Sequence, residues 1–123
     1  MTVQELYQSI DGNYDAAKGI LMMDKLITKF VIKFLDDKSY EKLANAWAAR
    51  DVSGAFEGAH ALKGVCANLG MNKLSGLASE LAEEFRPGSA RKLSDDEVTQ
   101  RLAAITELYE KSIGGIRAFA AAQ

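Results

Sequence analysis

The spacing of the apolar residues is the feature that most limits what this chain can fold into. These residues recur three and four positions apart, as in Leu26, Phe30 and Phe34, and no segment alternates apolar and polar residues as a half-buried strand would. Only one proline, Pro87, interrupts the 123 residues, so few positions force a helix to end. We therefore predict an all-α fold.

Capping and turn residues divide the apolar stripes into separate helices. Residues that favour helix N-termini precede four of the stripes, at Asp24, Ser39, Asp51 and Ser94. Ser94 and Glu97 have the spacing of a capping box. Gly70 is expected to end the helix that begins after Asp51, because glycine adopts the left-handed conformation found there. The clearest loop is RPGSARKL at 86–93, and Gly114-Gly115 is expected to fray or bend the last helix.

Short connections between long amphipathic helices make neighbouring helices pack antiparallel. The sequence therefore predicts an antiparallel up-down-up-down four-helix bundle with one or two additional N-terminal helices. A hydrophobic content of 48% and a charged content of 26% are ordinary for a globular domain. We expect one domain spanning residues 1–123, which is long enough to bury a core without disulfides.

Charge and hydropathy exclude several classes of partner. A formal net charge of −2 argues against nucleic-acid binding as the dominant activity. The longest apolar runs, such as ILMM at 20–23, are far too short to span a bilayer, and the first residues lack the apolar core of a signal peptide. We expect a cytoplasmic monomer without a nucleic-acid or membrane partner. We also expect an independent protein, the alternative being an excised domain of a larger kinase.

The stretch AHALKGVCANLG, residues 59–70, contains the only histidine of the chain, His60. At about 100° per residue, the apolar residues of this helix share one face, and His60 lies roughly 120° from the middle of that face. The apolar face consists of Val52, Ala55, Phe56, Ala59, Leu62, Cys66 and Leu69. His60 is therefore predicted to be exposed.

The residues one turn after His60 leave space beside its ring. Helical side chains lean toward the N-terminus, so a side chain at position 64 would cover His60. Position 64 is a glycine and position 67 an alanine, whereas Lys63 brings a cation within reach. An imidazole that is neutral near pH 7 is a good nucleophile, and lysine binds phosphate as a point charge. The spacing favours a histidine that accepts a phosphoryl group.

Other interpretations of this histidine are weaker. A lone histidine is often only a surface polar residue, but a glycine inside a helix usually has a reason. Glu57 and His60 form a Glu-x-x-His pair, as in di-iron bundles, yet that site needs a second such pair and inward-facing ligands. No metal site is therefore predicted. Cys66 is expected to be a small buried thiol and not a partner of His60 in catalysis.

The residues His60-Ala61-Leu62-Lys63-Gly64 and Asn68-Leu69-Gly70 resemble the signature of histidine-containing phosphotransfer (HPt) domains, His-x-Leu-Lys-Gly followed by Asn-Leu-Gly. The resemblance covers about residues 20–118. It implies a four-helix bundle that serves as a phosphorelay intermediate. His60 would take a phosphoryl group from the aspartate of one receiver domain and pass it to the aspartate of another.

The resemblance also implies roles for the neighbours of His60. Lys63 would balance the phosphate charge, and Gly64 and Ala67 would leave room for the ring and the incoming receiver. Candidates for the receiver-docking surface are Phe56, Glu57, Asn68 and Met71. Phosphoryl carriers of this kind have no autonomous kinase activity and no cofactor of their own.

The implied partners are receiver domains of response regulators and hybrid histidine kinases, and the receiver would supply magnesium. The alternative is a helical module that docks receivers without transferring phosphate. The intact His60, Lys63 and Gly64 argue against this alternative.

Overall fold

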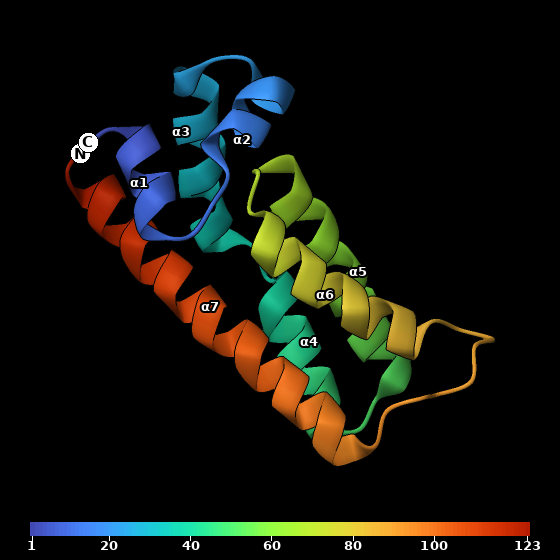
Figure 1. Ribbon diagram of the computed structural model, residues 1–123. Coiled ribbons are helices and arrows are strands. Elements are labelled where there is room, and N and C mark those ends of the chain that lie inside the picture. Colours follow the sequence, from blue (N-terminus) through green and yellow to red (C-terminus); the bar gives the residue numbers. More distant parts are fainter.

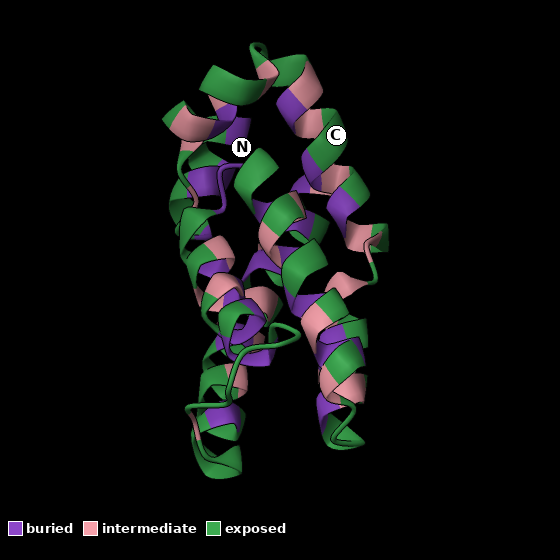
Figure 2. Cartoon of the chain, turned by 90° about the vertical axis from the view of Figure 1, so that its right-hand side faces the viewer, coloured by how far each residue is buried: buried purple, intermediate pink, exposed green.

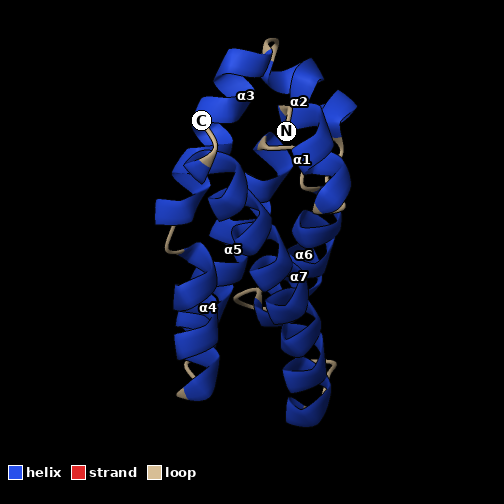
Figure 3. Ribbon diagram, turned by 90° about the vertical axis from the view of Figure 1, so that its left-hand side faces the viewer, coloured by secondary structure: helices blue, strands red, loops and turns tan.

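The computed structural model describes residues 1–123, and it contains helices and connecting segments without a strand (Figure 3). The all-α prediction is therefore confirmed. The helices, in chain order, are α1 (Val3–Ser9), α2 (Tyr14–Leu21), α3 (Asp24–Lys33), α4 (Ser39–Ala48), α5 (Val52–Asn68), α6 (Asn72–Phe85) and α7 (Asp95–Ala121), with a 3-10 turn η1 (Phe34–Asp36) between α3 and α4.

Helices α4 to α7 form a bundle in chain order, with α5 packed between α4 and α6 (Figure 1). Residues 49–51 and 69–71 are the only links from α4 to α5 and from α5 to α6, so each helix runs back along the one before it. A longer segment, residues 86–94, leads from α6 to α7. At 27 residues, α7 is long enough to pack on both α6 and the N-terminal helices.

Three helices precede the bundle, where the sequence predicted one or two. They gather at one end of the molecule, beside the C-terminal part of α7 (Figure 1). Met22 has a φ of 74° and ends α2, so that α2 and α3 are separate helices. The Tyr7 hydroxyl of α1 donates a hydrogen bond of 2.6 Å to the carbonyl oxygen of Leu69 and ties this end to the C-terminus of α5.

The hydrophobic core is one continuous cluster to which all seven α-helices contribute. Buried residues follow the inner sides of the helices, and the outer sides are exposed (Figure 2). Tyr7, Phe34 and Phe119 are among its largest side chains. No helix has both the length and the apolar character needed to cross a membrane.

Two of the four predicted helix caps are confirmed. The Asp51 side chain accepts from the Gly54 N–H at 3.0 Å, and Ser94 and Glu97 form the capping box that opens α7. Asp24 and Ser39 are instead the first residues inside their helices.

Side-chain hydrogen bonds explain the two displaced caps. The Asp37 carboxylate accepts from the backbone N–H of Ser39 at 2.9 Å and so takes over the capping of α4. Asp24 accepts hydrogen bonds from the Tyr14 hydroxyl and the Lys18 ammonium, and its carboxylate therefore joins α2 to α3.

Glycines permit two close contacts between the N-terminal helices and the bundle. Gly70 ends α5 with a φ of 69°, as predicted, and a Cβ there would lie 2.5 Å from the carbonyl oxygen of Asn13. A Cβ on Gly115 would lie 2.6 Å from Ile10 Cγ2 of α1. The expected fraying at Gly114-Gly115 is wrong, because α7 continues through both residues and Gly115 serves the contact with α1.

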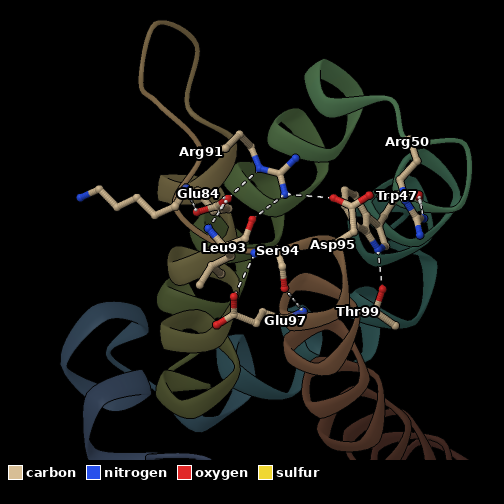
Figure 4. Close-up of polar contacts among 10 residues, drawn as sticks. Trp47, Arg50, Glu84, Arg91, Leu93, Ser94, Asp95, Glu97 and Thr99 are labelled. Atoms are coloured by element: carbon tan, nitrogen blue, oxygen red, sulfur yellow. Dashed lines mark hydrogen bonds and ion pairs between the residues drawn. The ribbon is translucent and has the colours of Figure 1, made fainter.

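The end of the bundle away from α1 is closed by a buried carboxylate, Glu84 (Figure 4). Its oxygens accept from Arg91 Nε at 2.6 Å and from the backbone N–H groups of Lys92 and Leu93 at 3.1 Å each. The Arg91 guanidinium also lies 5.5 Å from the centre of the Trp47 ring. These contacts fasten the 86–94 segment to α6 and α4.

Candidate functional site

Contacts on two sides hold α5, the helix that carries His60. A Cβ on Gly58 would lie 2.5 Å from the backbone nitrogen of Leu43, so glycine allows α4 to approach α5 at backbone distance. On the other side, the Ser75 hydroxyl of α6 donates to the Lys63 carbonyl oxygen at 2.9 Å. The helix is therefore fixed between its neighbours, with one face toward solvent.

His60 lies on this solvent face and is exposed, as the helical periodicity predicts. Its imidazole stacks on the ring of Phe56, one turn earlier, with 5.5 Å between ring centres and 20° between ring planes. Phe56 is half-buried and packs against the core. The aromatic ring thus supports the imidazole from a fixed position while the rest of the imidazole is open to solvent.

The space next to His60 is empty on the C-terminal side. Gly64 is exposed, and a Cβ built on it would meet no heavy atom within 4 Å outside its own helix backbone. Ala67, one turn further, is also exposed. The fold itself therefore gives no steric reason for glycine at position 64, in contrast to Gly58.

Lys63 is half-buried, and its ammonium group takes part in none of the ion pairs of the structure. It is three residues from His60, the spacing at which helical side chains are neighbours. Some other lysines are engaged in ion pairs, for example Lys42 with Glu57 at 2.6 Å. An unpaired cation beside an exposed imidazole can bind an anion formed on the ring.

The four predicted docking residues have different environments. Glu57 is exposed but engaged by Lys42, and Asn68 is exposed at the edge of a groove between α5 and the α2–α3 region. Phe56 supports His60, as described above. The assignment of Met71 to the docking surface is wrong, because only 3% of this residue is exposed. The chain reverses at Gly70, and the reversal turns Met71 into the core.

Two residues near the site, Glu83 and Arg86, were missed by the sequence analysis. The Arg86 guanidinium carbon lies 5.9 Å from the centre of the Phe56 ring, and its nitrogens donate two hydrogen bonds to the Glu83 carboxylate. Chiefly this Arg86 contact, and more weakly the charge of Lys63, hold the pKa of Glu83 below its usual value. Counting the antiparallel register from the short α5–α6 connection would have placed the end of α6 near Phe56.

No group of three or more His, Cys, Asp or Glu side chains is arranged to hold a metal ion. Glu57 of the Glu-x-x-His pair is bound to Lys42 instead. Cys66 is fully buried, and burial raises the pKa of its thiol to about 12. A thiol with so high a pKa is a poor nucleophile at neutral pH.

Comparison with known proteins identifies the family. The family model named Hpt domain matches residues 36–112, which includes α4, α5, α6 and much of α7 together with His60 and its neighbours. No curated protein and no solved structure matches the chain. The matched segment is more than half of the chain and coincides with the helical bundle. The chain therefore belongs to the Hpt domain family, whose members act in histidine phosphotransfer in two-component signalling and interact with receiver domains.

Proposed function

We propose that this chain is a phosphorelay intermediate that accepts a phosphoryl group on His60 from a receiver-domain aspartate and passes it to another receiver. It acts as a cytoplasmic monomer between receivers of hybrid histidine kinases and response regulators. The observation that carries the proposal is the exposed imidazole of His60 between the open space at Gly64 and the unpaired ammonium of Lys63. This arrangement lies within the segment that matches the Hpt family.

In the transfer step, the outer nitrogen of the His60 ring attacks the phosphorus of an aspartyl phosphate. A P–N bond forms, the P–O bond to the aspartate breaks, and the carboxylate leaves with the electron pair. The stack on Phe56 orients the ring, and Lys63 offsets the negative charge of the phosphoryl oxygens. Magnesium belongs to the receiver, so the chain needs no cofactor of its own.

The receiver is proposed to dock over His60 and the groove beside Asn68. Counted at 100° per residue on α5, Asn68 lies about 80° from His60 on one side and Lys63 about 60° on the other. The groove is lined by apolar residues that include Ile20 and Phe30, which are 51% and 37% exposed. Exposed apolar patches of this kind mark interaction surfaces.

The test is transfer of radioactive phosphate from a phosphorylated receiver domain. We expect an acid-labile, base-stable label on the wild-type chain and none on His60→Gln. Lys63→Ala should transfer or retain phosphate less well, and Phe30→Glu should slow transfer by weakening docking. Label that persists on His60→Gln would end the His60 assignment, and unchanged rates in the other two variants would remove their proposed roles.

The same assay separates the proposal from a docking module that does not transfer phosphate. Such a module would bind the phosphorylated receiver, measured by calorimetry, and remain unlabelled. A labelled chain whose label moves on to a second receiver would show the full relay.

A further inference from the structure

The residues beside the candidate phosphoacceptor include an ion pair that the transfer step does not use. Arg86 follows the last residue of α6, and its guanidinium faces the Phe56 ring, which itself stacks on His60. The guanidinium carbon lies 5.9 Å from the Phe56 ring centre, and that centre lies 5.5 Å from the imidazole centre. These two distances together set the upper limit of the separation between Arg86 and the imidazole. Arg86 and His60 thus pack on the same aromatic ring, from which the long Arg86 side chain can move toward a phosphoryl group on His60.

When His60 carries no phosphate, the Arg86 guanidinium is hydrogen-bonded to the carboxylate of Glu83. Arg86 Nε donates to Glu83 Oε2 at 3.2 Å, and Arg86 Nη2 donates to Glu83 Oε1, a two-pronged contact. Both side chains are exposed, at 44% for Arg86 and 58% for Glu83. Exposed ion pairs contribute little to stability, so this contact can break without disturbing the fold.

A phosphoryl group would compete with Glu83 for the same cation. Arginine binds phosphate through the same two parallel hydrogen bonds that it gives a carboxylate, and a phosphoryl group carries more negative charge. Glu83 would remain in water after losing Arg86, since its side chain is already exposed. The exchange therefore leaves no buried unpaired charge.

We propose that Arg86 is a second phosphate-binding residue, which Glu83 holds while His60 is bare and which moves to the phosphoryl oxygens once His60 is phosphorylated. The Glu83–Arg86 pair then sets how strongly the chain retains its phosphoryl group. This inference rests on the proposed role of His60. It adds a cation from α6 to the one that Lys63 supplies from α5.

The experiment uses phosphoramidate, a small donor that requires no receiver. Its P–N bond breaks, the P–N bond to His60 forms, and ammonia is released, so the equilibrium constant follows from the phosphorylated fraction at fixed phosphoramidate and ammonia concentrations. Phosphorus NMR measures this fraction. We expect Arg86→Ala to lower the equilibrium constant about two- to fivefold, the range of an exposed charge contact. Arg86→Lys should fall between Arg86→Ala and the wild type.

Glu83→Gln should change the equilibrium in the opposite direction and raise it by a similar factor, because Arg86 is then free. Most of this gain should disappear when Glu83→Gln is combined with Arg86→Ala. Asp11→Asn is the matched control: it removes one carboxylate from the exposed Asp11–Lys111 ion pair, and asparagine tolerates the φ of 57° at that position. We expect it to leave the equilibrium unchanged.

A spectroscopic measurement separates phosphate binding from a structural role. The side-chain Nε–H resonance of Arg86 should shift when phosphoramidate is added to the wild type and stay in place in His60→Gln. If the wild type is phosphorylated but Arg86→Ala and Glu83→Gln match it, the inference is overturned and the relay function stands. If His60→Gln is phosphorylated to the same extent as the wild type, the proposed function itself fails.

Discussion

Gly58 and Gly64 are both in α5, but an added side chain would meet very different surroundings at the two positions. At Gly58 a Cβ would lie 2.5 Å from the Leu43 backbone nitrogen, whereas at Gly64 it would meet nothing within 4 Å. Glycine within a helix costs about 1 kcal/mol relative to alanine. Close packing with α4 accounts for this cost at Gly58. At Gly64 packing does not account for it, whereas the proposed role of Gly64 in access to His60 would.

This contrast leads to a prediction for Gly64→Leu. The variant should unfold at a higher urea concentration than the wild type, because leucine is the better helix former. We expect its unfolding free energy to rise by about 0.5–1 kcal/mol. Transfer from a phosphorylated receiver should nevertheless slow, since the new side chain leans over His60. Gly114→Leu is the control, as Gly114 is an exposed helical glycine of α7 with the same empty surroundings. Equal transfer rates in the two variants would contradict the steric role of Gly64.

The arrangement of His60, Lys63 and Gly64 could be predicted from the sequence because all three lie within two turns of one helix. Their relative positions follow from helical periodicity alone. The place of Arg86 depends on how α6 packs against α5, which no local pattern describes. Met71 was misassigned for a similar reason, because its direction depends on the turn at Gly70.

At the scale of elements, the contact between α4 and α5 depends on a small residue at one point. We predict that Gly58→Ala destabilises the protein by about 1–3 kcal/mol, although alanine favours helices, because the added methyl group forces α4 away. Urea denaturation followed by circular dichroism measures the change. Gly64→Ala on the same helix should shift stability the opposite way, by up to about 1 kcal/mol. A stabilised Gly58→Ala variant would show that α4 adapts freely.

The sequence predicted helices better than it predicted where they begin. Asp51 and Ser94 cap their helices because each side chain is free to bond the first turn. Asp24 and Ser39 are of the right residue types, but the Asp24 carboxylate bonds Tyr14 and Lys18 instead of the first turn of α3, and Asp37 bonds the Ser39 N–H. Three N-terminal helices are present where the sequence predicted one or two, and Met22, which ends α2 with a positive φ, is not a residue type associated with such a conformation.

For the whole molecule, the ionisation of Glu84 makes the folding stability depend on pH. Burial favours the protonated form, but hydrogen bonds from Arg91 and two backbone N–H groups outweigh this effect and lower the pKa of Glu84. The pKa is therefore lower in the folded than in the unfolded state. Glu84 adds stability above its unfolded pKa, and this contribution is lost as the pH falls through the folded value.

We accordingly predict that Glu84→Gln lowers the unfolding free energy at pH 7 by about 1.5–3 kcal/mol, the range for hydrogen bonds to a charged group. The difference from the wild type should shrink on acidification below the unfolded pKa. Urea titrations between about pH 3 and pH 7 measure both effects, because carboxyl groups titrate in this range. Glu107→Gln, at an exposed position of α7, should show neither. A constant difference across this pH range would refute the coupling.

If Gly64 keeps His60 accessible to the receiver, as proposed, the empty space there means that folding and signalling favour different residues at a single position. In a variant library sorted by the amount of folded protein, alanine would become common at position 64 while glycine persisted at position 58. The same library sorted by signalling output would keep glycine at both positions. Comparing the two libraries at position 64 would then separate the requirements of the partner protein from those of the fold.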